Sequence, residues 1–274
     1  MHFNFDFPVV KILWTLTLAA LLVLLVVLLG RDRARRFPFF TAYIVLVALR
    51  LIMSRLLYGR LPSLTLGEIF ITLADLTALA GLLVVVEMAR RAFAGLQPSL
   101  WIVNSAGLLT AVGAVMAVWG PWPAWKTLTA DSHTVALRLM QLAAEKTDLL
   151  VVLLTVGLGL AVVLFGRRYK AGWRSHTQRI VIGLFTSAIS QLALTVALQR
   201  IAQTARPQTR ADLDRIVGFR DKLINAGSIV YLAVLVWWIV CLWIDEPGTQ
   251  ADVAELPAEA EQKREPVTQR LPSP

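Results

Sequence analysis

Seven long apolar stretches occupy most of this 274-residue chain, and they limit its fold more than any other feature. The stretches lie near residues 9–30, 38–58, 66–88, 98–119, 148–166, 179–200 and 223–244. About 20 mainly apolar residues in a helix cross a hydrocarbon core roughly 30 Å thick. In lipid the backbone polar groups must be satisfied internally, so runs of this length become helices. The sequence therefore predicts an all-α integral membrane protein, with a seven-helix bundle over residues 1–246.

The composition agrees with a membrane protein. Hydrophobic residues make up 57% of the chain, and the mean hydropathy is +0.66, well above the values of typical soluble domains. The net charge of +9 lies mostly between the apolar stretches. There it indicates loops beside anionic lipid headgroups rather than a nucleic-acid interface. We therefore expect the lipid bilayer as a partner and no nucleic acid.

Basic residues gather in alternate loops. Residues 31–36 contain four Arg, residues 90–91 two, and residues 167–179 four Arg and one Lys. All three segments lie on one side, which the positive-inside rule makes cytoplasmic. We expect the N-terminus outside and the C-terminus inside. Residues 206–222 oppose this orientation with five basic residues, although three Asp are interleaved among them.

The segments outside the apolar stretches also carry signals. Ser132 is suited to cap a helix that continues into residues 148–166, and Thr209 or Asp212 to start one that continues into residues 223–244. Both extensions would form a small outer cap. Residues 247–274 contain five prolines and predict a disordered cytoplasmic tail. The Arg- and Ala-rich composition favours a multi-pass protein of a bacterial inner (cell) membrane.

Ionisable residues inside an apolar stretch are costly in lipid and mark candidate sites. Arg50 and Asp75 lie at matching depths in the second and third stretches, roughly 12–14 Å below the outer surface. One interpretation is a structural ion pair between the two helices. The other is a ligand site, in which Arg50 binds an anion and Asp75 takes up a proton. Arg55 and Glu68 match nearer the surface and predict an outer ion pair.

The sixth stretch carries a polar stripe with a four-residue spacing. Its members are Gly183, Ser187, Gln191, Thr195 and Gln199. This spacing places them on one slowly turning face, which we expect to point into the bundle. Such a face either packs and hydrogen-bonds against neighbouring helices or lines a polar cavity. Asn225, Ser228 and Tyr231 of the seventh stretch would form the facing wall.

The residues for several kinds of catalysis are absent from the sequence. All three histidines lie outside the apolar stretches, and Cys241 is the only cysteine. We therefore expect no haem, zinc or iron–sulfur cofactor. Neither a zinc-protease motif, a glycine-rich phosphate loop nor a G-x-S-x-G elbow occurs. The interior of the seventh stretch has no lysine for a retinal Schiff base. We expect no enzymatic activity.

A short internal match suggests a repeat. Residues 26–31 (VVLLGR) and 162–167 (VVLFGR) agree at five of six positions, and both precede a basic loop. Helices 1–3 and 5–7 would then form parallel repeats around the fourth helix, which resembles the architecture of small sugar permeases. The mid-helix prolines that those permeases use as hinges are absent from the apolar stretches.

Two hypotheses for function follow. The leading one is a non-enzymatic sensory or interaction module that detects a small-molecule ligand and acts through a separate cytoplasmic protein partner. The alternative is a small-solute permease or ion-coupled transporter, with a polar site between the second, third, sixth and seventh helices.

Overall fold

The computed structural model describes residues 9–57, 60, 62–93, 98–118, 133–165, 176–204 and 209–244, and the regular structure in these residues is all α-helical. The helices are α1 (Val9–Gly30), α2 (Arg33–Arg36), α3 (Pro38–Leu57), α4 (Ser63–Ala92), α5 (Pro98–Val118), α6 (His133–Phe165), α7 (His176–Thr204) and α8 (Arg210–Trp243). The predicted all-α class is confirmed. The predicted tail, residues 247–274, lies outside the described part of the chain.

Six of the described helices are long and apolar enough to cross a membrane, namely α1, α3, α4, α6, α7 and α8. They make the chain a multi-pass membrane protein. Val26, Leu29 and Leu164 remain 66–69% exposed, as side chains that face lipid tails do. The fourth predicted stretch also forms a helix, α5, in which Gly107–Val118 is a shorter apolar segment.

Two helices begin well before their apolar stretches. α6 begins at His133 and α8 at Arg210, so both predicted helical extensions are confirmed. Thr209 is the N-cap of α8, where its Oγ1 accepts a hydrogen bond from the backbone N of Asp212 at 3.2 Å. Ser132, the predicted cap of α6, lies outside the described residues. With 33 and 34 residues, each helix is about 50 Å long and exceeds the hydrocarbon core.

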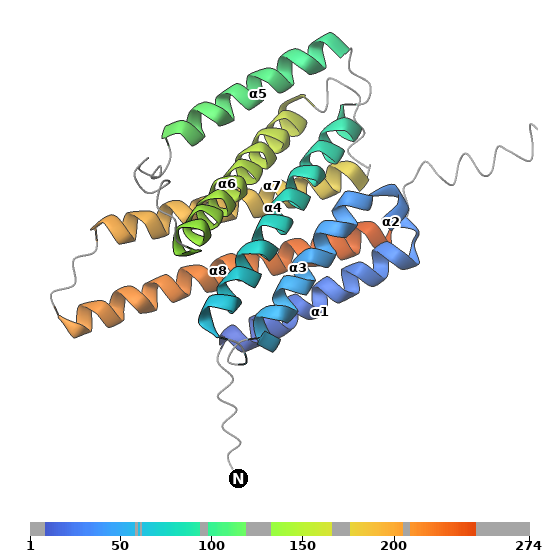
Figure 1. Cartoon of the computed structure of the whole chain (residues 1–274). Coiled ribbons are helices and arrows are strands. Elements are labelled where there is room, and N and C mark those ends of the chain that lie inside the picture. The colour runs from blue at the N-terminus through green and yellow to red at the C-terminus, as the bar shows by residue number, and fades with distance from the viewer. Residues whose placement is uncertain are drawn as a thin grey trace, which may run out of the picture.

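The six long apolar helices form a closed ring (Figure 1). Around it, α1 packs on α3, α3 on α4, α4 on α6, α6 on α7, α7 on α8, and α8 on α1. Two sets of three long helices make up the ring, α1–α3–α4 and α6–α7–α8. When α1, α3 and α4 are matched in order with α6, α7 and α8, each helix contact of the ring corresponds to another contact of the ring. The predicted parallel repeat requires this correspondence. However, α5 lies outside the ring and packs mainly against α6, instead of lying between the repeats.

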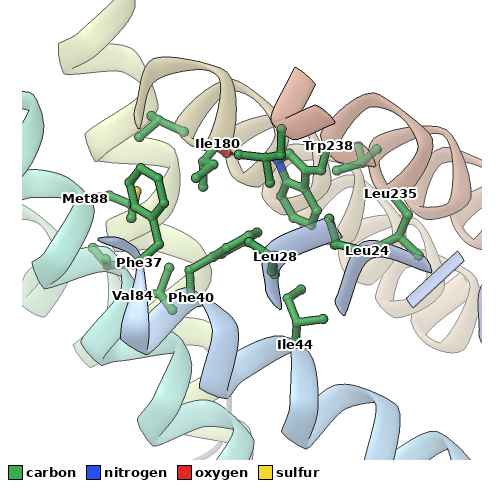
Figure 2. Close-up of a cluster of buried hydrophobic side chains, with 14 of the residues drawn as sticks. Leu24, Leu28, Phe37, Phe40, Ile44, Val84, Met88, Ile180, Leu235 and Trp238 are labelled. Atoms are coloured by element: carbon green, nitrogen blue, oxygen red, sulfur yellow. Dashed lines mark hydrogen bonds between the residues drawn. The ribbon is translucent and has the colours of Figure 1, made fainter. Parts of the chain in front are cut away.

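One end of the ring is tightly packed. We call it the basic end, because Arg31–Arg36, Arg90, Arg91 and Arg179 lie there. Every helix of the ring contributes buried apolar side chains to a core beside this end. Figure 2 shows its centre, where Phe40 of α3 and Trp238 of α8 meet among side chains of α1, α4 and α7. The two aromatic rings pack edge to face, with their centroids 5.2 Å apart.

Hydrogen bonds tie the helices together at the basic end. In the first set, the Glu87 carboxylate on α4 accepts from the backbone N of Phe40 at 3.2 Å and from Arg91 at 3.3 Å. The Phe40 N–H lies in the first turn of α3, where helical N–H groups lack partners within their own helix. In the second set, the Trp238 indole on α8 donates to the carbonyl of Ile180 near the start of α7, at 3.3 Å. In each set, the third helix (α4 or α8) is thus hydrogen-bonded to the first turns of the second helix (α3 or α7).

The opposite end of the ring is hollow, and we call it the cavity end. Along α4, residues 74–81 line a cavity and residues 84–88 reach the core. Along α6, residues 148–152 line the same cavity and residues 158–162 belong to the core. Both helices therefore run from the cavity end towards the basic end, parallel to one another.

Candidate functional site

A cleft of about 940 Å³ opens at the cavity end, mainly between α1, α3, α7 and α8. Its upper walls are largely apolar, with Leu13 and Trp14 of α1 and Phe70 of α4 among the lining side chains. Its polar lining comes mostly from α3, α7 and α8. These polar residues include Arg50, Ser187, Ser190, Gln191, Asn225 and Tyr231.

Two smaller cavities adjoin this cleft. The α4–α6 cavity, of about 400 Å³, lies between α3, α4, α6 and α7, and the α6–α7 pocket has about 390 Å³. Arg50 and Tyr231 line both the cleft and the α4–α6 cavity. Asp148 lines both the α4–α6 cavity and the α6–α7 pocket, and Gln191 lines all three spaces. The three spaces therefore meet at one cluster of polar side chains.

We call this cluster the polar junction; it comprises Tyr43, Arg50, Asp148, Gln191 and Tyr231. Gln191 Nε2 donates a hydrogen bond to Asp148 Oδ2 at 2.8 Å. Asp148 also interacts electrostatically with Arg50, and Tyr43 interacts with both charges. Arg50 and Tyr43 belong to the first helix set, whereas Asp148, Gln191 and Tyr231 belong to the second. The polar junction thus bridges the two sets where the three spaces meet, and Arg50, Asp148 and Gln191 are exposed towards these spaces.

Three donors of the polar junction, Tyr43, Arg50 and Tyr231, have no hydrogen-bond acceptor among the described residues. The hydroxyl of Tyr231 is buried and has no hydrogen-bond partner there. A buried polar group left unsatisfied costs about 1–3 kcal/mol, so a ligand acceptor at this point would be favoured. Arg50 is exposed towards the cavities that it lines, and its interacting acid in the described chain, Asp148, acts on it only through electrostatics.

Most residues that the sequence singled out lie around these spaces. Arg50, Ser187, Gln191, Asn225 and Tyr231 line the cleft, and Thr195 lines the α6–α7 pocket. The polar stripe of α7 therefore faces the cavities from Ser187 onward. Its first member, Gly183, lies deeper, where the indole of Trp238 covers it.

The predicted pair of Arg50 with Asp75 is not found. No ion pair joins the two side chains, and Asp75 lines none of the three spaces. The reason is the rotation of α4: Ala74 and Ala78 face the α4–α6 cavity, and the next residue along a helix points about 100° away. Arg55 is exposed near the end of α3 and Glu68 is half-buried near the start of α4. Their pairing stays a prediction.

Asp148 was missed as a site residue. The fifth apolar stretch starts at this position, and hydropathy alone would put the carboxylate at the membrane surface. In the structure α6 begins fifteen residues earlier, so Asp148 lies well within the helix, and its exposed side chain lines two cavities of the bundle. The predicted helix that starts at Ser132 could have revealed this position, because residue 148 then lies in the middle of a helix and not at its start.

Among the described residues, no group of three His, Cys, Asp or Glu side chains is placed to hold a metal ion. Comparison with known protein families, curated proteins and solved structures finds no match for the chain. The chemistry available at the site is hydrogen bonding and charge: donors from Arg50 and Tyr231, and an acceptor in Asp148.

Proposed function

We propose that this chain is a membrane receptor without enzymatic activity, which binds a small organic ligand in the cleft and transmits binding to the basic end. The polar junction is the observation that carries this proposal. A ligand on the cleft floor that contacts Arg50 of α3 and Tyr231 of α8 touches both helix sets at once. Binding energy that differs between two arrangements of the sets shifts their populations. The packed core beside the basic end transmits that shift.

The proposal includes a seventh membrane span, α5. It is supported by the parallel directions of α4 and α6, because the chain leaves α4 at the basic end and enters α6 from the cavity end. The connection has to return across the bundle, and α5 is the helix within it. Its 21 residues are about 32 Å long, which matches the hydrocarbon core.

In this proposal the basic end faces the cytoplasm of a bacterial cell, and the cleft opens outside the inner membrane. The concentration of Arg at the basic end supports the orientation. The guanidinium of Arg31 lies 5.1 Å from the Trp243 ring centroid, and that of Arg91 lies 4.9 Å from the Phe37 ring centroid, as expected at a headgroup boundary. A separate cytoplasmic protein partner would bind at the basic end.

The basic residues at the cavity end do not form a comparable concentration. In the extension of α8 they alternate with acids. The sequence there contains Arg210, Asp212, Asp214, Arg215, Arg220, Asp221 and Lys222. Four basic and three acidic side chains leave this segment close to neutral, whereas residues 31–36 hold four Arg and one Asp.

The experiment is a ligand screen by thermal stability of the purified full-length protein, with a metabolite library. Ser187 lines the cleft, and Ser187→Leu would fill its floor. Its neighbour Thr186 is exposed and lines none of the three spaces, so Thr186→Leu is the matched control. We expect stabilising compounds whose effect is lost in S187L and kept in T186L. A screen without such compounds contradicts the receptor proposal.

A small-solute permease is the second candidate, and the twofold pattern of the ring favours it. Parallel repeats around a central site are a known transporter architecture, and the site would lie between α3, α4, α7 and α8. Proteoliposomes distinguish the candidates. A permease moves the stabilising compound across the membrane, and Asp148→Asn would abolish this flux. A receptor binds the compound and shows no flux.

A further inference from the structure

We infer that the ligand of the cleft is a small amphipathic organic anion, whose anionic group is bound by Arg50 and Tyr231. This inference rests on the proposed binding function and names the chemistry of the ligand. It follows from the distribution of donors, acids and apolar surface along the cleft.

Among the residues that the structure describes, Arg50 is the only cationic side chain that lines the cleft. It lies seven residues before the end of α3 at Leu57, about 10 Å inside along the helix axis. Its interacting acid, Asp148, lines the other two spaces and does not line the cleft. On its cleft side the guanidinium forms no ion pair with an acid of the described residues. A guanidinium presents paired N–H donors that match a carboxylate or a phosphate.

Tyr231 adds a second donor at the same depth. Its buried hydroxyl has no partner among the described residues, and it lines the same two spaces as Arg50. Some other polar groups of the cleft already have acceptors: Ser228 donates to the Ile224 carbonyl at 3.0 Å, and Gln191 donates to Asp148. Ser187, Ser190 and Asn225 also line the cleft and offer neutral donors. Among the described residues of the cleft, Arg50 supplies the charged donor and Tyr231 the buried donor that lacks a partner. Together, the donors of Arg50 and Tyr231 favour a ligand group that is negatively charged and has several hydrogen-bond acceptors.

Asp221, the acidic residue that lines the cleft, lies too far from Arg50 to bind an ammonium group next to a ligand carboxylate at Arg50. Asp221 lies ten residues before Tyr231 on α8, which places it about 15 Å nearer the mouth. It also lies beside Arg220, with Nε 3.9 Å from its carboxylate. An α-amino acid whose carboxylate met Arg50 would place its ammonium group beside the same arginine. The cleft therefore favours an anion without a neighbouring positive charge.

The walls above the polar floor are suited to an apolar ligand body. Leu13, Trp14, Phe70, Leu194 and Ile224 line them. A free organic anion and the headgroup and upper chain of an anionic lipid share this chemistry. The test therefore includes an arm that separates the two sources.

The test measures equilibrium binding of three matched probes to the full-length protein in phosphatidylcholine nanodiscs. The probes are 3-phenylpropanoate, 3-phenylpropan-1-ol and 3-phenylpropylamine, which share one apolar body and differ in the headgroup. We expect the carboxylate to bind about tenfold or more tighter than the alcohol, as one charge-assisted contact provides, and the amine to bind more weakly than both. Empty nanodiscs give the background from partition into lipid.

Substitutions at Arg50 and Tyr231 test whether these residues cause the preference for the carboxylate probe. Arg50→Gln should remove the preference for the carboxylate over the alcohol, and Tyr231→Phe should weaken carboxylate binding by about threefold to tenfold. Arg50→Lys should restore part of the preference. Arg55→Gln is the control, because Arg55 lies on the same helix, is exposed and does not line the cleft. It should bind all three probes as the wild type does.

The outcomes separate this inference from the proposed function. If the alcohol binds as tightly as the carboxylate and R50Q and Y231F change neither, the anion inference is wrong while a ligand-binding cleft stands. If no probe binds although the library screen finds cleft ligands, the inference is equally wrong. Nanodiscs that contain phosphatidylglycerol decide the source. Competition by this lipid, lost in R50Q, identifies a lipid headgroup, whereas unchanged carboxylate binding identifies a soluble anion.

Discussion

At the scale of single residues, the polar junction depends on two opposite charges that lie within electrostatic reach inside an apolar bundle. Arg50 and Asp148 come from different helix sets, and Gln191 holds the Asp148 carboxylate by a hydrogen bond of 2.8 Å. A charge in a site of low dielectric is costly unless another charge compensates it. Arg50 and Asp148 are both exposed towards the cavities, so their attraction is partly screened, and each set supplies one of them.

A double-mutant cycle tests this coupling. We expect Arg50→Gln and Asp148→Asn each to destabilise the protein, because each leaves the other charge uncompensated. The double variant should be more stable than the sum of the single effects predicts, by about 0.5–3 kcal/mol. The measurement is the free energy of unfolding in mixed detergent micelles. As a control, Arg50→Gln combined with Asp75→Asn should be additive within about 0.5 kcal/mol; coupling to Asp75 instead would restore the pair expected from sequence.

The residues of the cleft could be predicted from sequence where they form a pattern on one helix. Ser187, Gln191 and Thr195 recur every fourth position, and this spacing alone shows that they share a face. The pairing of Arg50 could not be predicted, because depth matching ignores the rotation of a helix. Asp75 has the right depth on α4 and the wrong face, whereas Asp148 was not considered because it lies at the edge of the fifth apolar stretch.

At the scale of elements, the close packing of α7 on α8 depends on Gly183. A Cβ at this position would run into the indole of Trp238. That indole is 1% exposed and donates to the Ile180 carbonyl at 3.3 Å, so it has little room to move. We expect Gly183→Ala to destabilise the protein by about 1–3 kcal/mol, the usual cost of overpacking. The melting temperature in detergent measures this effect.

Gly218 of α8 is the matched control. A Cβ there would meet nothing within 4 Å, and alanine is a better helix former than glycine. Gly218→Ala should leave the melting temperature unchanged or raise it. Equal destabilisation by both substitutions would show that the loss at Gly183 does not come from the Trp238 contact.

The start of α8 depends on Thr209. Its hydroxyl accepts from the backbone N of Asp212 at 3.2 Å and donates to the Asp212 carboxylate at 2.7 Å. Thr209→Ala removes both bonds and should destabilise the first turn by about 0.5–2 kcal/mol. Hydrogen–deuterium exchange of residues 209–216 should accelerate, while exchange in the core segment around Trp238 stays unchanged.

Thr204 offers the comparison at the end of α7. Its hydroxyl donates to the Arg200 carbonyl of its own helix and accepts from no N–H group of the described residues. Thr204→Ala should therefore leave exchange in α8 as it is. A similar acceleration in both variants would mean that the first turn of α8 does not depend on the Thr209 cap.

Helix positions were predictable from sequence, and helix lengths were predictable in part. Apolar runs locate the segment that crosses lipid, but a helix continues wherever its backbone stays satisfied. Hydropathy alone therefore starts α6 and α8 too late by fifteen and thirteen residues. The capping residue Thr209 gives the true start of α8, since it marks where the N–H groups of the first turn find an acceptor.

At the scale of the whole molecule, the two ends of the bundle differ in charge and in packing, and this difference supports the proposed orientation, which can be tested. Cys241 is buried, so Cys241→Ala gives a background without thiols. Arg35 at the basic end has an 87% exposed side chain, and Arg220 at the cavity end a 59% exposed one. We expect a membrane-impermeant maleimide to label Arg220→Cys in intact cells and Arg35→Cys only after permeabilisation. The reverse pattern would overturn the proposed orientation.

The closure of the ring could not be predicted from sequence. Leu, Val and Ala dominate every long helix, so their apolar faces do not specify which helices become neighbours. The match between residues 26–31 and 162–167 suggested two parallel sets, but it held no information on the place of α5. Contacts such as Phe40 on Trp238 close the ring, and they join residues that are 198 positions apart in sequence.

The place of α5 outside the ring has a consequence for biogenesis. Ribosomes complete α5 before they begin α6, its main packing partner. In the proposed arrangement with seven spans, α5 has to partition into lipid on its own apolarity when it leaves the translocon. No Asp, Glu, Lys, Arg or His occurs between Pro98 and Val118, so no charge opposes that step. The α1–α3–α4 set is then already synthesised, and the α6–α7–α8 set joins it as it emerges, so that the order of synthesis becomes the order of assembly.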